Sequence, residues 1–331
     1  MISNFMKNQE FKNRALSDSD VVDILYDIMT NQIPDYDGNK STWMNALDIG
    51  VSYDYVIKGF SALADFKNLC TGTYSVAPGT VTLTENRDKN LDVTAFVQRC
   101  YQIMMLRRGD VNGLNAWTGA LLNRVKTGAQ VIEFFVTSPE FVNQKLDNED
   151  TVEVLYNVML DRPSDAGKAG WVSNLEDDHV SIRYVVNGFA GSTEFKNLCY
   201  TYVIAPGRVN LTEARDKNIN VTRFVNRCYS KALMREADIG GLNTWCNAIL
   251  TKTRTPQQVA WGFVFSKECR DMELGNAAFV EMLYELYMGR PSDSGRTTWI
   301  NALNGGMSRE DAVTRFARSA EFRAIVASYG L

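Results

Sequence analysis

The chain has 331 residues, of which 45% are hydrophobic and 22% charged, and its formal net charge is −4. This composition is typical of a globular protein with enough apolar material for a real core. No block of Lys and Arg indicates a nucleic-acid partner. No apolar run approaches the roughly 18 residues of a membrane span. The sequence therefore predicts neither a nucleic-acid partner nor a membrane-spanning segment.

The chain starts inside a repeat. Residues 2–20 align with residues 132–150, and Phe11 falls opposite Phe141. The start has no apolar region of the kind that signal peptides carry. We therefore expect the chain to be a piece of a longer exported protein. Its residues 1–19 would form a truncated half-repeat, helical from residue 2 and docked on the first full unit.

Internal repetition is the main feature of the sequence. Residues 78–101 match residues 206–229 at 17 of 24 positions, and residues 56–70 match residues 185–199 at 8 of 15. Each long unit divides again, because a Tyr, an acidic turn, a Trp and a Phe-rich stretch recur five times. The Tyr and Trp positions are Tyr26, Tyr101, Tyr156, Tyr229 and Tyr284, and Trp43, Trp117, Trp171, Trp245 and Trp299. The predicted organisation is a half-repeat over 1–19 and five copies over 20–92, 93–150, 151–220, 221–276 and 277–331.

The elements of each copy are predicted to be helices. Phe96, Cys100 and Met104 recur at a spacing of four, which places them on one helical face. Asp110 and its matches Asp165 and Asp293 are placed to cap the next helix or to accept bonds in the turn before it. The Ser, Pro and Glu at positions 138–140 are a further helix start. The fold class is therefore all-α, with tandem repeats of three to four helices each.

The first and third copies carry an insert, over residues 74–90 and 202–218. A Pro-Gly pair and alternating apolar residues predict a short hairpin or an extended loop. Both inserts carry aromatic, Arg and Asp side chains that are able to stack on sugars and hydrogen-bond to them. The candidate ligand-binding residues are Tyr74, Arg87, Asp88, Tyr202, Arg215 and Asp216. The alternative is that the inserts only brace neighbouring helices.

The repeated pattern LYxxxLxRxxDxxGxxxW…FxxSxEF resembles the domain of unknown function 4214 family. It is carried by Leu155, Tyr156, Arg162, Asp165, Gly167, Trp171, Phe189, Ser192, Glu194 and Phe195, and again between Leu283 and Phe322. The resemblance covers nearly the whole chain, although the first copy lacks the Arg and the fourth has Cys269 in place of the last Phe. It implies a secreted or cell-surface bacterial protein whose relatives accompany surface-layer, adhesion or polysaccharide-handling modules. It assigns no catalytic residue.

Six cysteines fall into three pairs that follow the repeats. One pair flanks each insert, and the duplication suggests that the members of a pair belong together. We predict three disulfides, each closing a loop of about 20 to 30 residues. They are Cys70–Cys100, Cys199–Cys228 and Cys246–Cys269. The alternative is buried free thiols in a cytosolic protein.

Other candidate sites favour structural roles. His179 is the one histidine, in a polar stretch that indicates a solvated loop, so a His-ligated metal cluster is excluded. The acidic turns offer too few oxygens for calcium. The repeated Trp residues, placed before apolar residues, favour core packing over sugar stacking, whereas Trp261 lies outside the pattern. No catalytic site, metal or cofactor is predicted.

Two classes of function follow. The first is a non-catalytic module that binds an extracellular polysaccharide or surface glycan, where several units suit a repetitive polymer. The alternative is a structural or assembly module, such as a spacer, a surface-layer element or a scaffold, with a protein partner or self-association.

Overall fold

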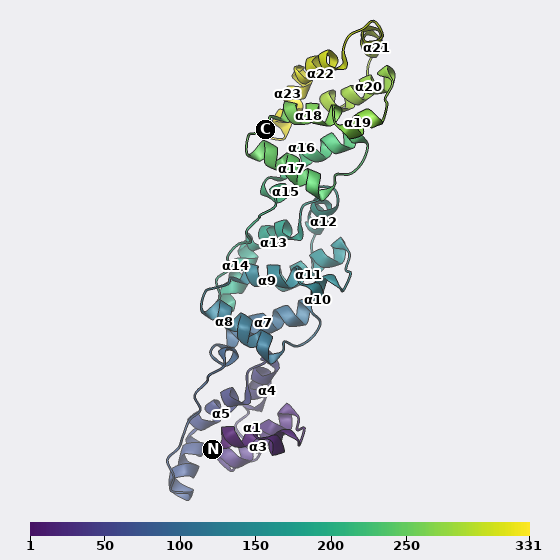
Figure 1. Ribbon diagram of the computed structural model, residues 1–331. Coiled ribbons are helices and arrows are strands. Elements are labelled where there is room, and N and C mark those ends of the chain that lie inside the picture. Colours follow the sequence, from purple (N-terminus) through teal and green to yellow (C-terminus); the bar gives the residue numbers. More distant parts are fainter. The chain divides into compact units, whose positions relative to one another are not determined.

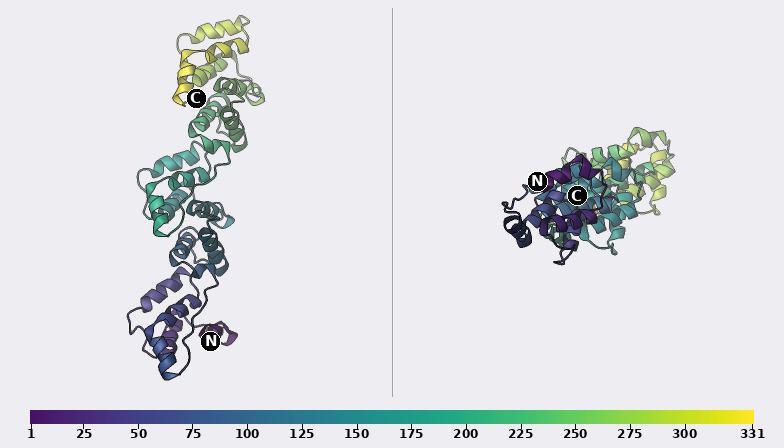
Figure 2. Two further views of the ribbon diagram at one scale, coloured as in Figure 1. Left: turned by 90° about the vertical axis from the view of Figure 1, so that its left-hand side faces the viewer. Right: turned by 90° about the horizontal axis from the view of Figure 1, so that it is seen from below.

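The computed structural model describes residues 1–331, and every regular element in it is a helix (Figures 1 and 2). The chain divides into two compact units. Unit 1 comprises Met1–Ser164 and Val186–Val209, and unit 2 comprises Asp165–Val185 and Asn210–Leu331. The predicted all-α tandem repeat is therefore confirmed. No helix combines the length and the apolar character needed to span a membrane.

Copies one and two lie wholly in unit 1, and copy three contributes to both units. The helices up to the end of copy one are α1 (Ile2–Lys7), α2 (Gln9–Lys12), α3 (Asp18–Thr30), α4 (Lys40–Ile49), α5 (Tyr53–Ala62) and α6 (Ala64–Asn68), followed by a π-helical turn (Leu69–Thr73) and a 3₁₀ turn (Asn86–Asp88). Copy two has α7 (Leu91–Met104), α8 (Val111–Leu122), α9 (Gly128–Val136) and α10 (Pro139–Val142). Copy three has α11 (Asn148–Leu160), α12 (Lys168–Glu176), α13 (Ile182–Ala190) and α14 (Thr193–Thr201).

Copies four and five lie in unit 2. Copy four is preceded by α15 (Ala214–Lys217) and has α16 (Ile219–Cys228), a π-helical turn (Tyr229–Leu233), α17 (Ile239–Leu250), α18 (Pro256–Val264) and α19 (Lys267–Asp271). Copy five has α20 (Asn276–Leu283), a π-helical turn (Tyr284–Met288), α21 (Arg296–Asn304), α22 (Arg309–Ala317) and α23 (Ala320–Ser328).

The repeated aromatic residues form the centre of each copy. In copy two, the ring of Phe135 lies 4.8 Å from Tyr101 and 5.8 Å from Trp117. In copy four, Phe263 lies 4.7 Å from Tyr229 and 5.1 Å from Trp245. Such edge and tilted contacts between buried rings stabilise a core beyond the area they bury. The five repeated Trp residues are half-buried, and Trp43, Trp245 and Trp299 pack against the core of their units, whereas Trp261 is 43% exposed.

In copies two, three and four, the Arg of the repeat pattern lies between a Tyr ring and a Glu carboxylate. Arg107 stacks over the ring of Tyr101 at 4.9 Å and forms two hydrogen bonds to Glu140, of 2.6 and 3.0 Å. Arg235 repeats this arrangement with Tyr229 and Glu268. This paired geometry ties the end of the first helix of a copy to the start of its last helix. The same Arg also lies near the Asp of the turn, at 3.7 Å for Arg107–Asp110 and 2.9 Å for Arg290–Asp293.

The helix starts follow the sequence signals. The side chain of Asp110 accepts a 2.8 Å hydrogen bond from the Gly113 amide, and the Ser138 hydroxyl accepts one of 3.2 Å from Phe141. Asp165 and Asp293 accept bonds from glycine amides two residues later, inside the turn. These acceptors satisfy amides that the helix cannot pair itself.

The first residues form two short helices instead of the single helix expected. The chain is extended at Asn8, whose side chain then caps α2 by accepting a hydrogen bond from the Phe11 amide. Met6 and Phe11 are buried in the core of the first copy, so the predicted docking of this segment is present.

Candidate functional site

All six candidate ligand-binding residues lie in the two inserts, and each insert has two structurally different halves. The first half of the first insert is an extended loop without strand pairing, so the extended alternative holds and the hairpin does not. In Figure 1 it runs beside the helices of unit 1, from the blue helical segment after α5 to the neighbourhood of α8. The second half folds into the 3₁₀ turn, and at the matched place of the second insert into α15.

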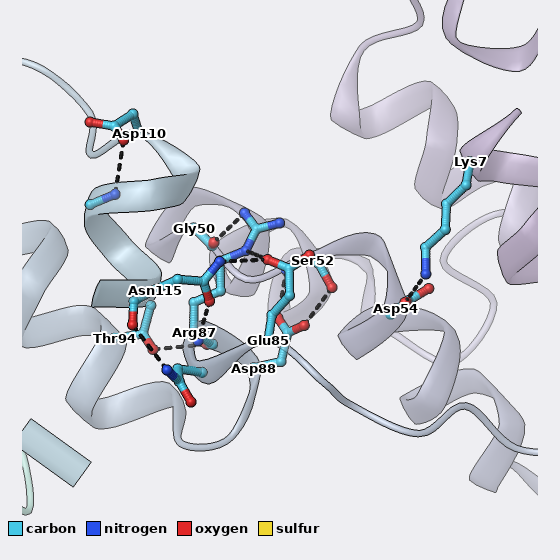
Figure 3. Close-up of polar contacts among 12 residues, drawn as sticks. Lys7, Gly50, Ser52, Asp54, Glu85, Arg87, Asp88, Thr94, Asp110 and Asn115 are labelled. Carbon is cyan, nitrogen blue, oxygen red and sulfur yellow. Dashed lines mark hydrogen bonds and ion pairs between the residues drawn. The ribbon is translucent and has the colours of Figure 1, made fainter. Parts of the chain in front are cut away.

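Arg87 is the centre of the second half of the first insert (Figure 3). Its Nε donates to Glu85 at 2.6 Å, and its Nη1 donates to the carbonyl of Gly50 at 3.0 Å. Asn115 of α8 completes the set, because its Oδ1 accepts from the Arg87 amide at 3.1 Å and its Nδ2 donates to Glu85 at 2.9 Å. The insert is thereby joined both to the loop after α4 and to α8 of the next copy.

Asp88 adds a second junction. Its two carboxylate oxygens accept from the amide and the hydroxyl of Ser52, at 2.7 and 2.6 Å. The Asp88 side chain is only 2% exposed, and Thr94, fully buried, donates to the Arg87 carbonyl at 2.8 Å. Charge-assisted hydrogen bonds of this kind are stronger than neutral ones. We call this set of contacts the insert bracket; it comprises Glu85, Arg87, Asp88 and their partners Gly50, Ser52, Thr94 and Asn115.

The same bracket recurs in unit 2. Arg215 donates to Glu213 at 2.7 Å and to the carbonyl of His179 at 2.5 Å. Asp216, also 2% exposed, accepts from the amide and hydroxyl of Ser181 at 2.8 and 2.6 Å. The remaining matches are Asn243, which contacts Arg215 and Glu213, and Thr222, which donates to the Arg215 carbonyl. Here the bracket joins the loop before α13 of copy three to α17 of copy four.

The bracket lowers the pKa of its glutamates. The hydrogen bond from Arg215 is the main cause of the lowered pKa of Glu213. For Glu85, burial acts to raise the pKa, but the hydrogen bonds from Arg87 and Asn115 outweigh it and the pKa lies below its usual value. Both carboxylates are therefore charged at neutral pH and engaged inside the fold.

The two candidate tyrosines differ. Tyr74 is 65% exposed, whereas Tyr202 is half-buried with its ring 5.7 Å from that of Phe96. The four candidate charged residues, Arg87, Asp88, Arg215 and Asp216, lie in the brackets. One residue of the six, Tyr74, thus presents most of its side chain to solvent.

A cavity of about 490 Å³ lies beside the first bracket, with a largely apolar lining that also includes Lys7, Asp54 and Arg87. Asp54 accepts from Lys7 at 2.5 Å and from Ser3 at 2.6 Å, as the right of Figure 3 shows for Lys7. Lys7 thus pairs with Asp54, as Arg87 pairs with Glu85. The repeat does not preserve this site, because the residues matched to Lys7 and Asp54 are Thr137 and Arg183. No cluster of three His, Cys, Asp or Glu residues is arranged to hold a metal ion.

The predicted disulfides are corrected by the structure: all six cysteines are buried free thiols, so Cys70–Cys100, Cys199–Cys228 and Cys246–Cys269 are not formed. Cys70 lines an apolar groove in copy one, whereas Cys100 is fully buried on α7, where the nearby thiol that acts on its pKa is Cys199. Cys246 lies 3.7 Å from the Thr222 hydroxyl, and Cys269 lies 3.9 Å from the Met282 sulfur. The cysteines recur because the helices that carry them recur, and each packs against its own neighbours.

Burial raises the pKa of Cys100, Cys199 and Cys228 to about 12. These thiols are therefore neutral and unreactive in the folded chain. His179 lies half-buried in the loop before α13, and its backbone carbonyl, not its ring, is what the bracket uses.

The sequence prediction missed the partners of the bracket. Ser52, Thr94 and Asn115 were not among the candidates, although each is identical to its match in the later copy, Ser181, Thr222 and Asn243. Identity at matched polar positions was the available signal. Ser52 and Asn115 lie 36 and 28 residues from their partners in the insert, so only the fold brings them together.

Comparison with known proteins identifies a family. No match was found among the curated proteins, and none among the solved structures. The profile of the domain of unknown function (DUF4214) matches five stretches of the chain, over residues 2–70, 82–145, 132–199, 210–273 and 271–326. These stretches cover far more than half of the sequence, so the chain belongs to the DUF4214 family.

Proposed function

We propose that the chain is a non-catalytic scaffold, whose inserts brace consecutive repeats. The observation that carries this proposal is the insert bracket, which occurs twice with hydrogen bonds of nearly the same length. In each occurrence the polar side chains of the insert form hydrogen bonds that join one copy to the next. Repeat arrays gain their stability from such contacts between neighbours.

Two ion pairs at the cavity beside the first bracket support the same proposal. Lys7 with Asp54, and Arg87 with Glu85, pair with one another. A ligand that used either charge would first have to break an internal ion pair. That the chain is not an enzyme is part of this proposal.

The cellular setting remains a proposal as well. A secreted or cell-surface location is suggested by the family resemblance of the repeat pattern. Disulfides would have supported an exported location, but the six cysteines are free thiols and give no such support.

Binding of an extracellular glycan is the second candidate, and the exposed ring of Tyr74 is the feature that favours it. A polysaccharide array probed with the wild-type chain and with Tyr74→Ala tests it. Tyr200→Ala is the matched control, because Tyr200 is equally exposed but lies on α14, outside the insert. Saturable binding that Tyr74→Ala abolishes and Tyr200→Ala retains would favour the glycan function over the scaffold.

The scaffold proposal is tested by removing one carboxylate from each bracket. Asp88→Ala leaves the amide and hydroxyl of Ser52 without their acceptor, and Asp216→Ala does the same to Ser181. Each substitution should lower the free energy of unfolding by about 2 kcal/mol, the penalty of leaving buried donors unpaired. Urea denaturation of each variant measures this. The proposal would be overturned if both variants kept the stability of the wild-type chain but no longer bound a ligand that the wild-type chain binds saturably.

A further inference from the structure

An apolar groove in copy one is open to solvent. It has a volume of about 480 Å³ and its lining includes Ile2, Met29, Ile57, Phe66, Cys70 and Tyr74. We call it the Tyr74 groove. Tyr74 is 65% exposed and Val76, also in the lining, is 53% exposed. Exposed apolar residues gathered around a hollow of this kind are typical of a surface that another molecule covers.

The matched groove later in unit 1 is covered by helix α7. There the ring of Phe96 packs edge-on against Tyr202, the residue matched to Tyr74, at 5.7 Å. Cys100, one turn further along α7, is fully buried and lies near Cys199, the match of Cys70. With this cover in place, Ile204 is only 6% exposed, against 53% for its match Val76.

Unit 2 shows the same arrangement independently. Phe224 of α16, the match of Phe96, packs against Tyr329 at 5.8 Å. Tyr329 follows Phe322 by seven residues, as Tyr202 follows Phe195. The insertion of a Phe from one helix beside a Tyr of the following copy is thus a rule of this fold and not an accident of one copy.

An Arg on the covering helix adds a polar anchor. Arg99 of α7 donates to the backbone carbonyl of Asn157, at the end of α11. Arg227 of α16 donates to the carbonyls of Glu285 and Leu286 in the same way. The matched carbonyls in copy one belong to Asp27 and Ile28, at the exposed end of α3. Carbonyls near a helix C-terminus favour a cation.

Backbone acceptors complete the pattern. In unit 1 the carbonyls of Ala205 and Pro206 accept from the amides of Gly128 and Ala129, at 2.8 and 3.0 Å. These amides belong to the first turn of α9 and have no partner within their helix. The matched carbonyls are those of Ala77, which lines the Tyr74 groove, and of its neighbour Pro78, and neither accepts from a backbone amide.

We propose that the Tyr74 groove binds a helical segment of the α7 type, supplied by a polypeptide other than this chain that carries the same repeat. The Phe of this segment packs against the ring of Tyr74. One turn later, a Cys or another apolar residue packs against Cys70. The Arg three residues after the Phe donates to the carbonyls of Asp27 and Ile28. The amides of its following helix meet Ala77 and Pro78. This inference deepens the proposed scaffold function, since it gives the array a surface for assembly.

The test uses the full chain and a synthetic peptide with the sequence of residues 88–130, under reducing conditions. Calorimetry should show saturable binding, with the peptide gaining helicity by circular dichroism as it docks. Val76→Lys in the chain, or Phe96→Ala in the peptide, should weaken binding about tenfold or more, because each removes the burial of an apolar side chain. Val142→Lys is the matched control, since Val142 is equally exposed but lies on α10.

A fusion separates a poor peptide from a wrong proposal. A variant that repeats residues 88–130 ahead of Met1 should protect the amides of residues 28 and 76–81 from hydrogen exchange. Absence of both peptide binding and this protection would overturn the proposal, as would peptide binding that Val76→Lys leaves unchanged. If the chain alone self-associates in sedimentation and Val76→Lys abolishes it, the occupant is a second copy and the proposed partner is wrong. None of these results alters the brackets, which Asp88→Ala and Asp216→Ala test separately.

Discussion

The two inserts have similar sequences but differ in their first halves and agree in their second halves. In the first insert, Val76 and Tyr74 are exposed, whereas in the second, Ile204 is buried and Tyr202 packs on Phe96. From Glu85 and from Glu213 onward, both form the same bracket. The second halves adopt the same conformation because the same bracket partners surround both of them. The burial of a first half depends instead on whether a helix covers it.

Removal of the covering ring should have the largest effect. Phe96→Ala empties a fully buried position in unit 1, and we expect a loss of about 3 to 5 kcal/mol of unfolding free energy. The amides of residues 204–209 should also exchange faster, so that the second insert comes to resemble the first. Urea denaturation and hydrogen exchange measure the two effects.

Tyr74→Ala is the control for this prediction, and it should leave stability within about 0.5 kcal/mol because the ring is exposed. If Phe96→Ala destabilised the chain but left exchange over residues 204–209 unchanged, the covering helix would not be what distinguishes the inserts.

The bracket arginines should have the next largest effect. Arg215→Ala removes bonds to Glu213 and to the His179 carbonyl, and should lower stability by about 3 kcal/mol, since a partly buried carboxylate loses its partner. Arg87→Ala should produce a similar loss in unit 1. Arg270→Ala, an exposed position on α19, serves as the control in the same denaturation series. Wild-type midpoints for both bracket variants would refute the claim that the brackets stabilise the chain, and a loss in only one of them would refute the claim that the second halves act alike.

The bracket also predicts a dependence on acid. The pKa values of Glu85 and Glu213 are lowered in the folded chain, so the stability they contribute is present above their unfolded values, about 4.3. It is lost as the pH falls through the folded values. The stability difference between wild type and the Arg215→Ala variant should therefore shrink as the pH is lowered below about 4.

A matched glycine pair sharpens the comparison at smaller scale. Gly207 has a φ of +66°, and a Cβ there would lie 2.1 Å from the Thr127 hydroxyl. Gly207→Ala should lower stability by about 2 kcal/mol through left-handed strain and this overlap. Its match Gly79 has open space around the Cβ position, so Gly79→Ala should change stability by less than about 0.5 kcal/mol. Equal effects of the two substitutions would mean that the first halves are packed alike.

Much of the fold could be predicted from the sequence, because periodicity and capping signals are local. Asp110 and Ser138 cap helices where the pattern placed them, and the Tyr, Trp and Phe of each copy form its centre. The roles of Arg87 and Asp88 were harder to predict. Polar side chains on an insert suggest a binding surface until their partners are known, and Ser52 and Asn115 lie 36 and 28 residues away along the chain.

The disulfide prediction failed for a similar reason. Two cysteines that recur together suggest a bond, but recurrence of the helices explains the same pattern. The distance between Cys70 and Cys100 in space depends on the course of the insert between them, which leads away from the π-helical turn of copy one to α7. Sequence spacing does not contain that course.

The thiols should show no effect of reduction at all. The intact mass of the chain should be the same before and after denaturing reduction, and six thiols should react with a labelling reagent only once the chain is unfolded. Because the folded pKa of Cys100, Cys199 and Cys228 is about 12, the stability linked to these thiols is present below their unfolded pKa and is lost as the pH rises toward 12. A mass increase on reduction would restore the disulfides.

The central claim is that both inserts brace consecutive copies through the same bracket, and hydrogen exchange of two amides tests it most directly. The amides of Ser52 and Ser181 donate to Asp88 and Asp216, although neither serine lies within a helix. Both amides should therefore exchange slowly in the native chain, and they should lose that protection in Asp88→Ala and Asp216→Ala, respectively. Fast exchange at both serines in the wild-type chain would contradict the account.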